Sequence, residues 1–148
     1  MTILKDRSYL LSLVFFIILV PLAYAEEISP RGVVLQWTKI YGVDYYQAAD
    51  LTTLEFRKGK SKEEWADQIG EILGSVKYKH LGGKVIEETI SGDNAAVVLD
   101  ARIYTIVGSA KQKEIYELKK IDGIWLINNI AVKEEEIEDD PRGSGKDL

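Results

Sequence analysis

Apolar residues recur at helical spacing in the part of the chain that follows residue 28. Ser29 can accept a hydrogen bond at a helix start, and Pro30 suits the first helical position. The apolar stripe that follows predicts a helix that ends at Gly42. Asp44 can cap a second, short helix. The pattern therefore predicts two helices in succession.

A third helix is predicted over 61–74. Ser61 and Glu64 form an S-x-x-E capping box, in which each side chain bonds the backbone of the other residue. Trp65 begins an apolar face that continues at helical spacing. Gly74 is expected to take the left-handed conformation that ends many helices.

Beyond residue 75 apolar and polar residues alternate, which is typical of strands. The pattern predicts four strands, over 76–90, 95–104, 113–121 and 124–132. Asp122-Gly123 is a strong two-residue hairpin signal between the last two strands. Gly82-Gly83 inside the first strand predicts a bulge or a sharp bend. Helices followed by an antiparallel meander indicate an α+β fold.

Three stretches of this sequence carry a resemblance to a known family. They read SPRGVVLQWTKIYGVDYYQAADL, SKEEWADQIGEIL and YELKKIDGIWLINNI. In this order they resemble the nuclear transport factor 2-like (NTF2-like) superfamily, in particular small exported domains of unknown function. The resemblance implies N-terminal helices packed on a strongly curved four-stranded antiparallel meander, an NTF2-like or cystatin-like cone with a cavity at its open end. It brings no catalytic signature.

The first 25 residues have the pattern of a secretory signal peptide. Lys5 and Arg7 precede an apolar run, and Ala23 and Ala25 fit the A-x-A cleavage rule. We expect cleavage after Ala25 and an extracytoplasmic location, either periplasmic or secreted. The alternative is an uncleaved anchor, which would be the protein's contact with the membrane.

Charge and composition limit the classes of function. The formal net charge is −5, and acidic residues gather in 133–148, which we predict to be a disordered acidic tail. The body, predicted as a single domain over 26–132, is close to neutral and offers no electrostatic basis for binding nucleic acid. The chain has no cysteine and one histidine, and it lacks the usual phosphate, metal and cofactor motifs. No cofactor and no metal site are therefore predicted.

Aromatic residues are dense on the predicted elements. Trp37, Trp65 and Trp125 are assigned to the core. A tyrosine hydroxyl is more easily accommodated beside a cavity than in a dry core. On that basis the residues predicted to line a ligand pocket are Tyr45, Tyr78, Tyr104 and Tyr116. The alternative is that these four rings belong to an ordinary core.

Candidates for acid–base chemistry are few. His80 is interpreted as a surface or strand-edge residue, with a general-base role as the alternative. Asp100 and Arg102 share one face of the second strand, and they are expected to point outward because Leu99 and Ala101 lie on the more apolar face. Asp44 is explained as a helix cap. No catalytic residue is assigned.

The sequence favours an exported, non-enzymatic domain that binds a small apolar ligand or a protein partner, with pairing of two copies through the sheet face. The alternative is a small lyase or isomerase of the ketosteroid-isomerase or polyketide-cyclase type. Such an enzyme needs an acid or a histidine in the cavity near Tyr104 or Tyr116. The positions of His80, Asp100 and Asp44 therefore distinguish the two hypotheses, and the enzyme hypothesis fails if all three face solvent.

Overall fold

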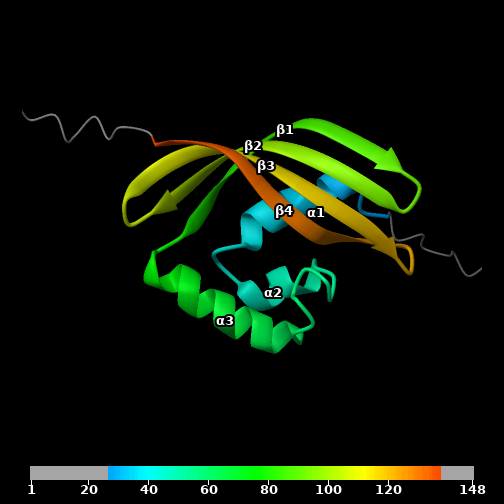
Figure 1. The fold of residues 1–148 in the computed structure, drawn as a ribbon, viewed down its shortest axis with the longest axis horizontal. Coiled ribbons are helices and arrows are strands. Elements are labelled where there is room, and N and C mark those ends of the chain that lie inside the picture. The colour runs from blue at the N-terminus through cyan, green and yellow to red at the C-terminus, as the bar shows by residue number, and fades with distance from the viewer. Residues whose placement is uncertain (1–26, 138–148) are drawn as a thin grey trace, which may run out of the picture.

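A computed structural model describes residues 27–137, as three helices followed by four strands (Figure 1). The helices are α1 (Pro30–Ile40), α2 (Tyr45–Asp50) and α3 (Lys62–Ser75). The strands are β1 (Lys79–Ser91), β2 (Asn94–Thr105), β3 (Gly108–Ile121) and β4 (Ile124–Ile137). The strands pair antiparallel in the order β1-β2-β3-β4, so the predicted α+β meander is confirmed.

The ends of the chain need separate comment. The predicted signal peptide with Ala25, and the tail beyond residue 137, lie outside the described residues. β4 continues past the predicted end at Val132, so 133–137 belong to the sheet and not to the tail. The reason is that β3 begins at Gly108, earlier than predicted, and its first residues pair with the end of β4. Between residues 27 and 137, no helix is both long and apolar enough to span a membrane.

Local chemistry sets the starts of the helices as expected. The Ser29 hydroxyl accepts from the Gly32 backbone at 3.1 Å, and Asp44 caps α2. Ser61 and Glu64 form the full capping box, with bonds of 3.0 and 3.1 Å.

The end of α3 differs from the prediction. Gly74 stays inside the helix, and Lys77 takes the left-handed conformation instead, with a φ of 52°. Lys77 N–H donates to the Gly74 carbonyl at 3.1 Å, and Tyr78 N–H donates to the Leu73 carbonyl at 3.0 Å. These two bonds form a Schellman motif. The motif fixes Tyr78 directly after the helix, where the chain turns toward β1.

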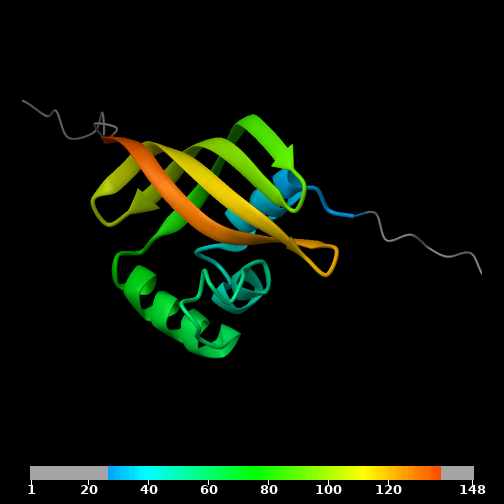
Figure 2. The ribbon, with the colours of Figure 1, turned by 45° about the vertical axis from the view of Figure 1, so that its right-hand side comes forward.

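The sheet is strongly twisted and arches over α1, with α2 and α3 beyond it (Figures 1 and 2). α1 packs against β1, β2 and β4, and α2 packs against α3. Trp37, Trp65 and Trp125 are all buried, which confirms their assignment to the core. The Trp37 and Trp65 rings lie 6.3 Å apart and join α1 to α3.

The two glycines of β1 form the predicted bulge. His80 pairs with Ile103, but the next paired residue of β1 is Gly83, opposite Ala101. Gly82 has a φ of 88°, which favours glycine. A Cβ on Gly83 would lie 2.3 Å from the Asp100 carbonyl oxygen, so β1 and β2 can approach here because Gly83 has no side chain. The bulge leaves His80 on the inner face of the sheet.

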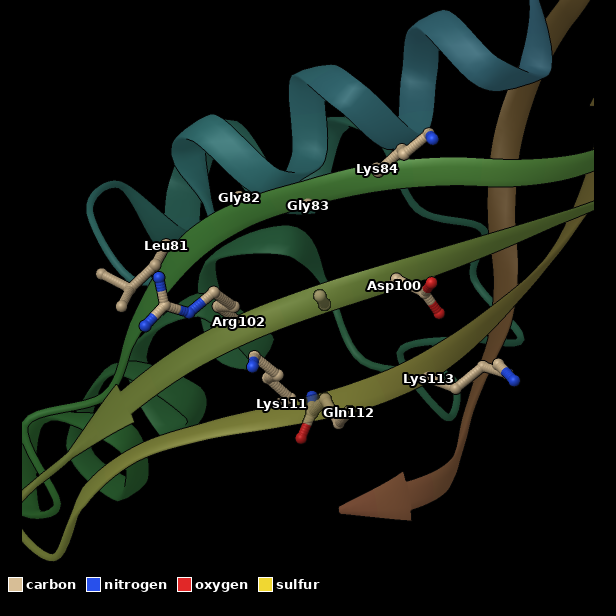
Figure 3. Close-up of a pocket in the computed structure, with 10 residues that line it drawn as sticks. Leu81, Gly82, Gly83, Lys84, Asp100, Arg102, Lys111, Gln112 and Lys113 are labelled. Carbon is tan, nitrogen blue, oxygen red and sulfur yellow. The ribbon is translucent and has the colours of Figure 1, made fainter. Parts of the chain in front are cut away.

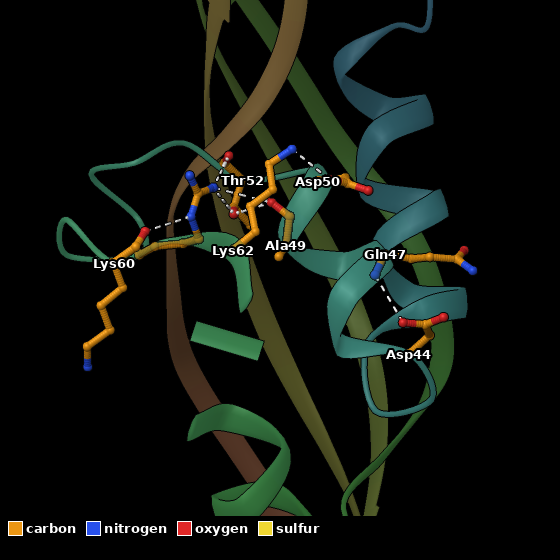
Figure 4. A network of polar contacts seen from close by, with 8 residues as sticks. Asp44, Gln47, Ala49, Asp50, Thr52, Lys60 and Lys62 are labelled. Atoms are coloured by element: carbon orange, nitrogen blue, oxygen red, sulfur yellow. Dashed lines mark hydrogen bonds and ion pairs between the residues drawn. The ribbon is translucent and has the colours of Figure 1, made fainter. Parts of the chain in front are cut away.

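A buried arginine fixes the loop between α2 and α3 (Figure 4). Arg57 Nη1 donates to the Thr52 carbonyl at 2.7 Å and to the Thr52 hydroxyl at 2.9 Å, and its Nε donates to the Lys60 carbonyl at 3.2 Å. The same loop bonds the edge of β4, where Thr53 N–H donates to the Ile127 carbonyl at 2.9 Å. The loop is thus held against the open edge of the sheet.

Candidate functional site

A cavity of about 630 Å³ lies between the inner face of the sheet and α1. Its volume falls in the range of about 300–1,000 Å³ that is typical of small-molecule sites. Half of its sixteen lining residues are aromatic or aliphatic, and these are Trp37, Tyr41, Phe56, Tyr78, Ile103, Tyr116, Ile130 and Val132. The cavity therefore suits a ligand with a substantial apolar part.

A buried carboxylate forms the polar centre of the cavity. Glu114 Oε2 accepts hydrogen bonds from His80 Nε2 at 3.2 Å and from the Tyr116 hydroxyl. Glu114 Oε1 accepts from Gln112 Nε2 at 2.6 Å. The side chains of His80 and Glu114 are 1% and 4% exposed. Three donors therefore converge on one carboxylate that water barely reaches.

The position of His80 corrects the interpretation of this residue as a surface or edge histidine. Its ring is buried because the bulge turns it inward, and its Nδ1 accepts from the Gly82 backbone N–H at 3.0 Å. A ring nitrogen that accepts carries no proton, so the geometry assigns the proton of the neutral ring to Nε2. The glycine bulge thereby orients the donor that faces Glu114.

The environment of Glu114 acts on its pKa in two opposing ways. Burial raises the pKa, but the hydrogen bonds from His80, Tyr116 and Gln112 favour the carboxylate, and the net result is a lowered pKa. Burial, followed by the nearby charge of Glu114, raises the pKa of Tyr116. Near neutral pH the cavity therefore holds one ionised carboxylate beside a protonated phenol.

This lowered pKa predicts how stability depends on pH. A carboxylate with a depressed pKa stabilises the folded state above its ordinary value of 4.5, and the contribution is lost as the pH falls through the folded-state pKa. Glu114→Gln cannot titrate at this position. We therefore expect the difference in unfolding free energy between the wild type and Glu114→Gln to shrink from about pH 7 to about pH 3. Urea denaturation at each pH measures it, and a difference independent of pH would contradict the prediction.

Two further tyrosines, Tyr41 and Tyr78, have hydroxyls without a hydrogen-bond partner among the described residues. The rings of Tyr41 and Tyr78 line the cavity and meet edge to face, with centroids 5.5 Å apart. Within 27–137 every fully buried side-chain polar atom has a hydrogen-bond partner. The hydroxyls of Tyr41 and Tyr78 have no hydrogen-bond partner there, so neither oxygen is fully buried. Both hydroxyls therefore reach the cavity space. Burial raises the pKa of each, so both remain protonated.

The structure separates the four tyrosines predicted to line a pocket. Tyr78 and Tyr116 line the cavity, and Tyr45 and Tyr104 do not. Tyr45 packs against the Tyr41 ring, with centroids 5.9 Å apart, and against α3. Tyr104 is 40% exposed because strand alternation places it on the face opposite Ile103. Tyr45 and Tyr104 therefore lie outside this cavity.

Sequence reasoning missed Glu114, although the signal was present. Glu114 lies two residues from Tyr116 and is therefore in phase with the inward-facing Tyr116 and Leu118. The expected outward direction of Asp100 and Arg102 is confirmed, since both side chains are exposed.

A second hollow, of about 510 Å³, lies beside the glycine bulge (Figure 3). Its charged lining residues are Lys84, Asp100, Arg102, Lys111 and Lys113. Their charges are of both signs, and the side chains lie spread along the strands without converging on one point. Over 27–137 no group of three or more side chains could hold a metal ion. The inner cavity is therefore the candidate site.

Comparison with known proteins identifies the fold. No family model matches the sequence, and no curated protein matches it. Among solved structures, a SEC-C motif containing protein from Rhodopseudomonas palustris aligns with a TM-score of 0.57 and 15% identity, covering 72% of this chain and 80% of that one. A protein of unknown function with a cystatin-like fold from Nostoc punctiforme aligns with a TM-score of 0.53 and 13% identity, covering 72% and 92%.

An NTF2-like protein of unknown function from Shewanella oneidensis aligns at a TM-score of 0.48 and 14% identity, covering 70% of this chain and 98% of that one. Similarity at these identities concerns the fold and not the activity. The protein has a cystatin-like α+β fold, as the resemblance of its sequence implied.

Proposed function

We propose that the protein is a non-enzymatic binding domain that holds a small, largely apolar molecule in its inner cavity. The observation that carries the proposal is the combination of aromatic walls with one convergent polar cluster around Glu114. Binding sites for small molecules typically have this composition, in which apolar surface supplies affinity and a few polar groups orient the ligand.

The hydrogen bonds of the cluster favour binding over catalysis. Both ring nitrogens of His80 are engaged, one with Glu114 and the other with Gly82. A general base works best when its pKa lies near the operating pH, whereas the pKa of Glu114 is lowered. Neither group is therefore poised to take a proton from a substrate.

One observation supports the alternative of a small lyase or isomerase. His80 lies in the cavity and reaches the same Glu114 oxygen as Tyr116, which is the neighbourhood that such an enzyme requires. In that case a ligand would have to displace the bond between His80 and Glu114 before either could act. Turnover of a bound molecule would decide in favour of this second function.

Export and self-association complete the proposal. The basic start, apolar run and Ala25 cleavage pattern support secretion of the domain. Pairing of two copies through the sheet face stays a prediction, supported by the exposed Tyr104 side chain on the outer face.

Native mass spectrometry of the protein purified from its own host tests the cavity directly. We expect a bound small molecule that is retained less in Ile130→Trp, because Ile130 lines the cavity and the larger side chain takes part of its space. The matched control is Ala131→Trp, since Ala131 is exposed and pairs with the outward-facing Ile115. Equal retention of the molecule by both variants, or its absence from the wild type, would contradict the proposal.

A further inference from the structure

We propose that the molecule bound in the inner cavity is an organic cation, a protonated amine attached to an apolar body. This inference rests on the proposed function and specifies the chemistry of its ligand. Three independent features of the cavity support it: the charge of its lining, the hydrogen-bonding positions left open, and the aromatic walls.

The charge of the lining is negative. Glu114 stands at the centre as a carboxylate. The exposed Glu117 also lines the cavity, as does the exposed Glu55, whose charge is paired with Lys119 at 2.6 Å. Among the described lining residues, Lys58 is the one lysine or arginine, and its side chain is exposed. Nδ1 of His80 accepts from the Gly82 N–H, so in this geometry the ring directs the proton on Nε2 toward Glu114. An anionic ligand would be repelled here, whereas a cation would compensate the Glu114 charge.

The unused hydrogen-bonding positions suit a donor. An ionised carboxylate offers about four acceptor positions, and Glu114 uses three of them. The remaining position lies on Oε1, which accepts only from Gln112. The open hydroxyl oxygens of Tyr41 and Tyr78 can accept as well. A protonated amine carries N–H donors for acceptors of this kind.

The aromatic walls suit a cation as well. The Trp37 and Tyr41 rings are stacked with centroids 4.3 Å apart, and Tyr78 meets Tyr41 edge to face. The faces of such rings carry negative potential and attract ammonium groups. Burial excludes water from this space, which strengthens the attraction. An apolar ligand without charge would fit the walls but would leave Glu114 uncompensated.

Three probes of nearly the same shape test the inference on the unmodified domain. They are 2-phenylethylammonium, 2-phenylethanol and phenylacetate. Each has a phenyl ring on a short chain, which ends in a cation, a neutral hydroxyl and an anion, respectively. Isothermal titration calorimetry near neutral pH should show the cation binding at least about tenfold more tightly than the alcohol. Phenylacetate should bind more weakly than either.

Two variants locate the effect. Glu114→Gln keeps the shape of the side chain and should remove most of the preference for the cation over the alcohol. Glu87→Gln is the matched control, because it removes the same charge from an exposed position of β1 that does not line the cavity and should change the preference little. Circular dichroism confirms that both variants are folded before they are compared.

The outcomes distinguish the two proposals. If the alcohol binds as tightly as the cation, the cation inference is overturned and the cavity proposal stands. If none of the three probes binds, the cavity proposal fails and the cation inference fails with it. If the cation is preferred equally in the wild type and in Glu114→Gln, the charge that selects it lies elsewhere and the inference is wrong.

Discussion

Replacement of His80 by Phe should lower the free energy of unfolding by about 3 kcal/mol, the upper end of the range expected when a buried polar group loses its hydrogen-bond partner. Phe keeps a ring of similar size but donates no hydrogen bond to Glu114. It also leaves the Gly82 N–H without its acceptor. The carboxylate would then be buried with one of its three donors missing. Urea denaturation of the variant and the wild type measures the loss.

A double-mutant cycle separates this effect from a simple change of shape. In the Glu114→Gln background no charge is left buried, so His80→Phe should be less damaging by about 1 kcal/mol or more. Lys119→Met is a control for the loss of an exposed charged contact. It breaks the pair of Lys119 with Glu55 at 2.6 Å and should change the free energy of unfolding very little. Additive effects of the His80 and Glu114 substitutions would show that the two residues are not coupled.

The two adjacent glycines of β1 should respond very differently to alanine. In Gly83→Ala the new Cβ would lie 2.3 Å from the Asp100 carbonyl oxygen and 2.9 Å from the Ala101 Cα, and backbone atoms cannot move aside cheaply. We expect a loss of about 3 kcal/mol, at the upper end of the range for overpacking. In Gly82→Ala the space is open and the cost arises from the φ of 88°, which predicts a loss of about 1 kcal/mol.

A second measurement ties the bulge to the site. The 15N chemical shifts of the His80 ring report which nitrogen carries the proton. Gly83→Ala should change them, because the displaced bulge no longer presents the Gly82 N–H to Nδ1. Gly82→Ala should leave the 15N chemical shifts nearly unchanged.

For the stability measurement, equal losses of unfolding free energy in Gly82→Ala and Gly83→Ala would contradict the close approach of β1 to β2 at Gly83.

Features set by nearby residues could be predicted from the sequence. The Ser61 and Glu64 capping box, the Asp44 cap and the Asp122-Gly123 turn each depend on contacts within a few positions, and all are present. The bulge of β1 followed from its two adjacent glycines. These predictions succeeded because local hydrogen bonds and backbone preferences decide the outcome at such places.

The candidate site could not be predicted in the same way, because its parts meet across the sheet. His80 and Glu114 lie 34 positions apart, and β2 separates their strands. A simple alternation along β1 cannot tell which face His80 takes, since the bulge shifts the register at that point. Glu114 was recoverable from its phase with Tyr116, but a buried glutamate is rare enough that a charged residue is read as exposed by default.

The Arg57 contacts carry a consequence for the cavity in acid. An arginine guanidinium keeps its charge under all conditions that proteins meet, and the partners of Arg57 are carbonyls and a hydroxyl, none of which titrates. The loop that supplies Phe56 to the cavity wall is therefore held by bonds that are indifferent to acid. Acidification would neutralise Glu114 while this wall keeps its place. The cavity could therefore release a bound cation in acid while this wall stays in place, and could bind the cation again at neutral pH.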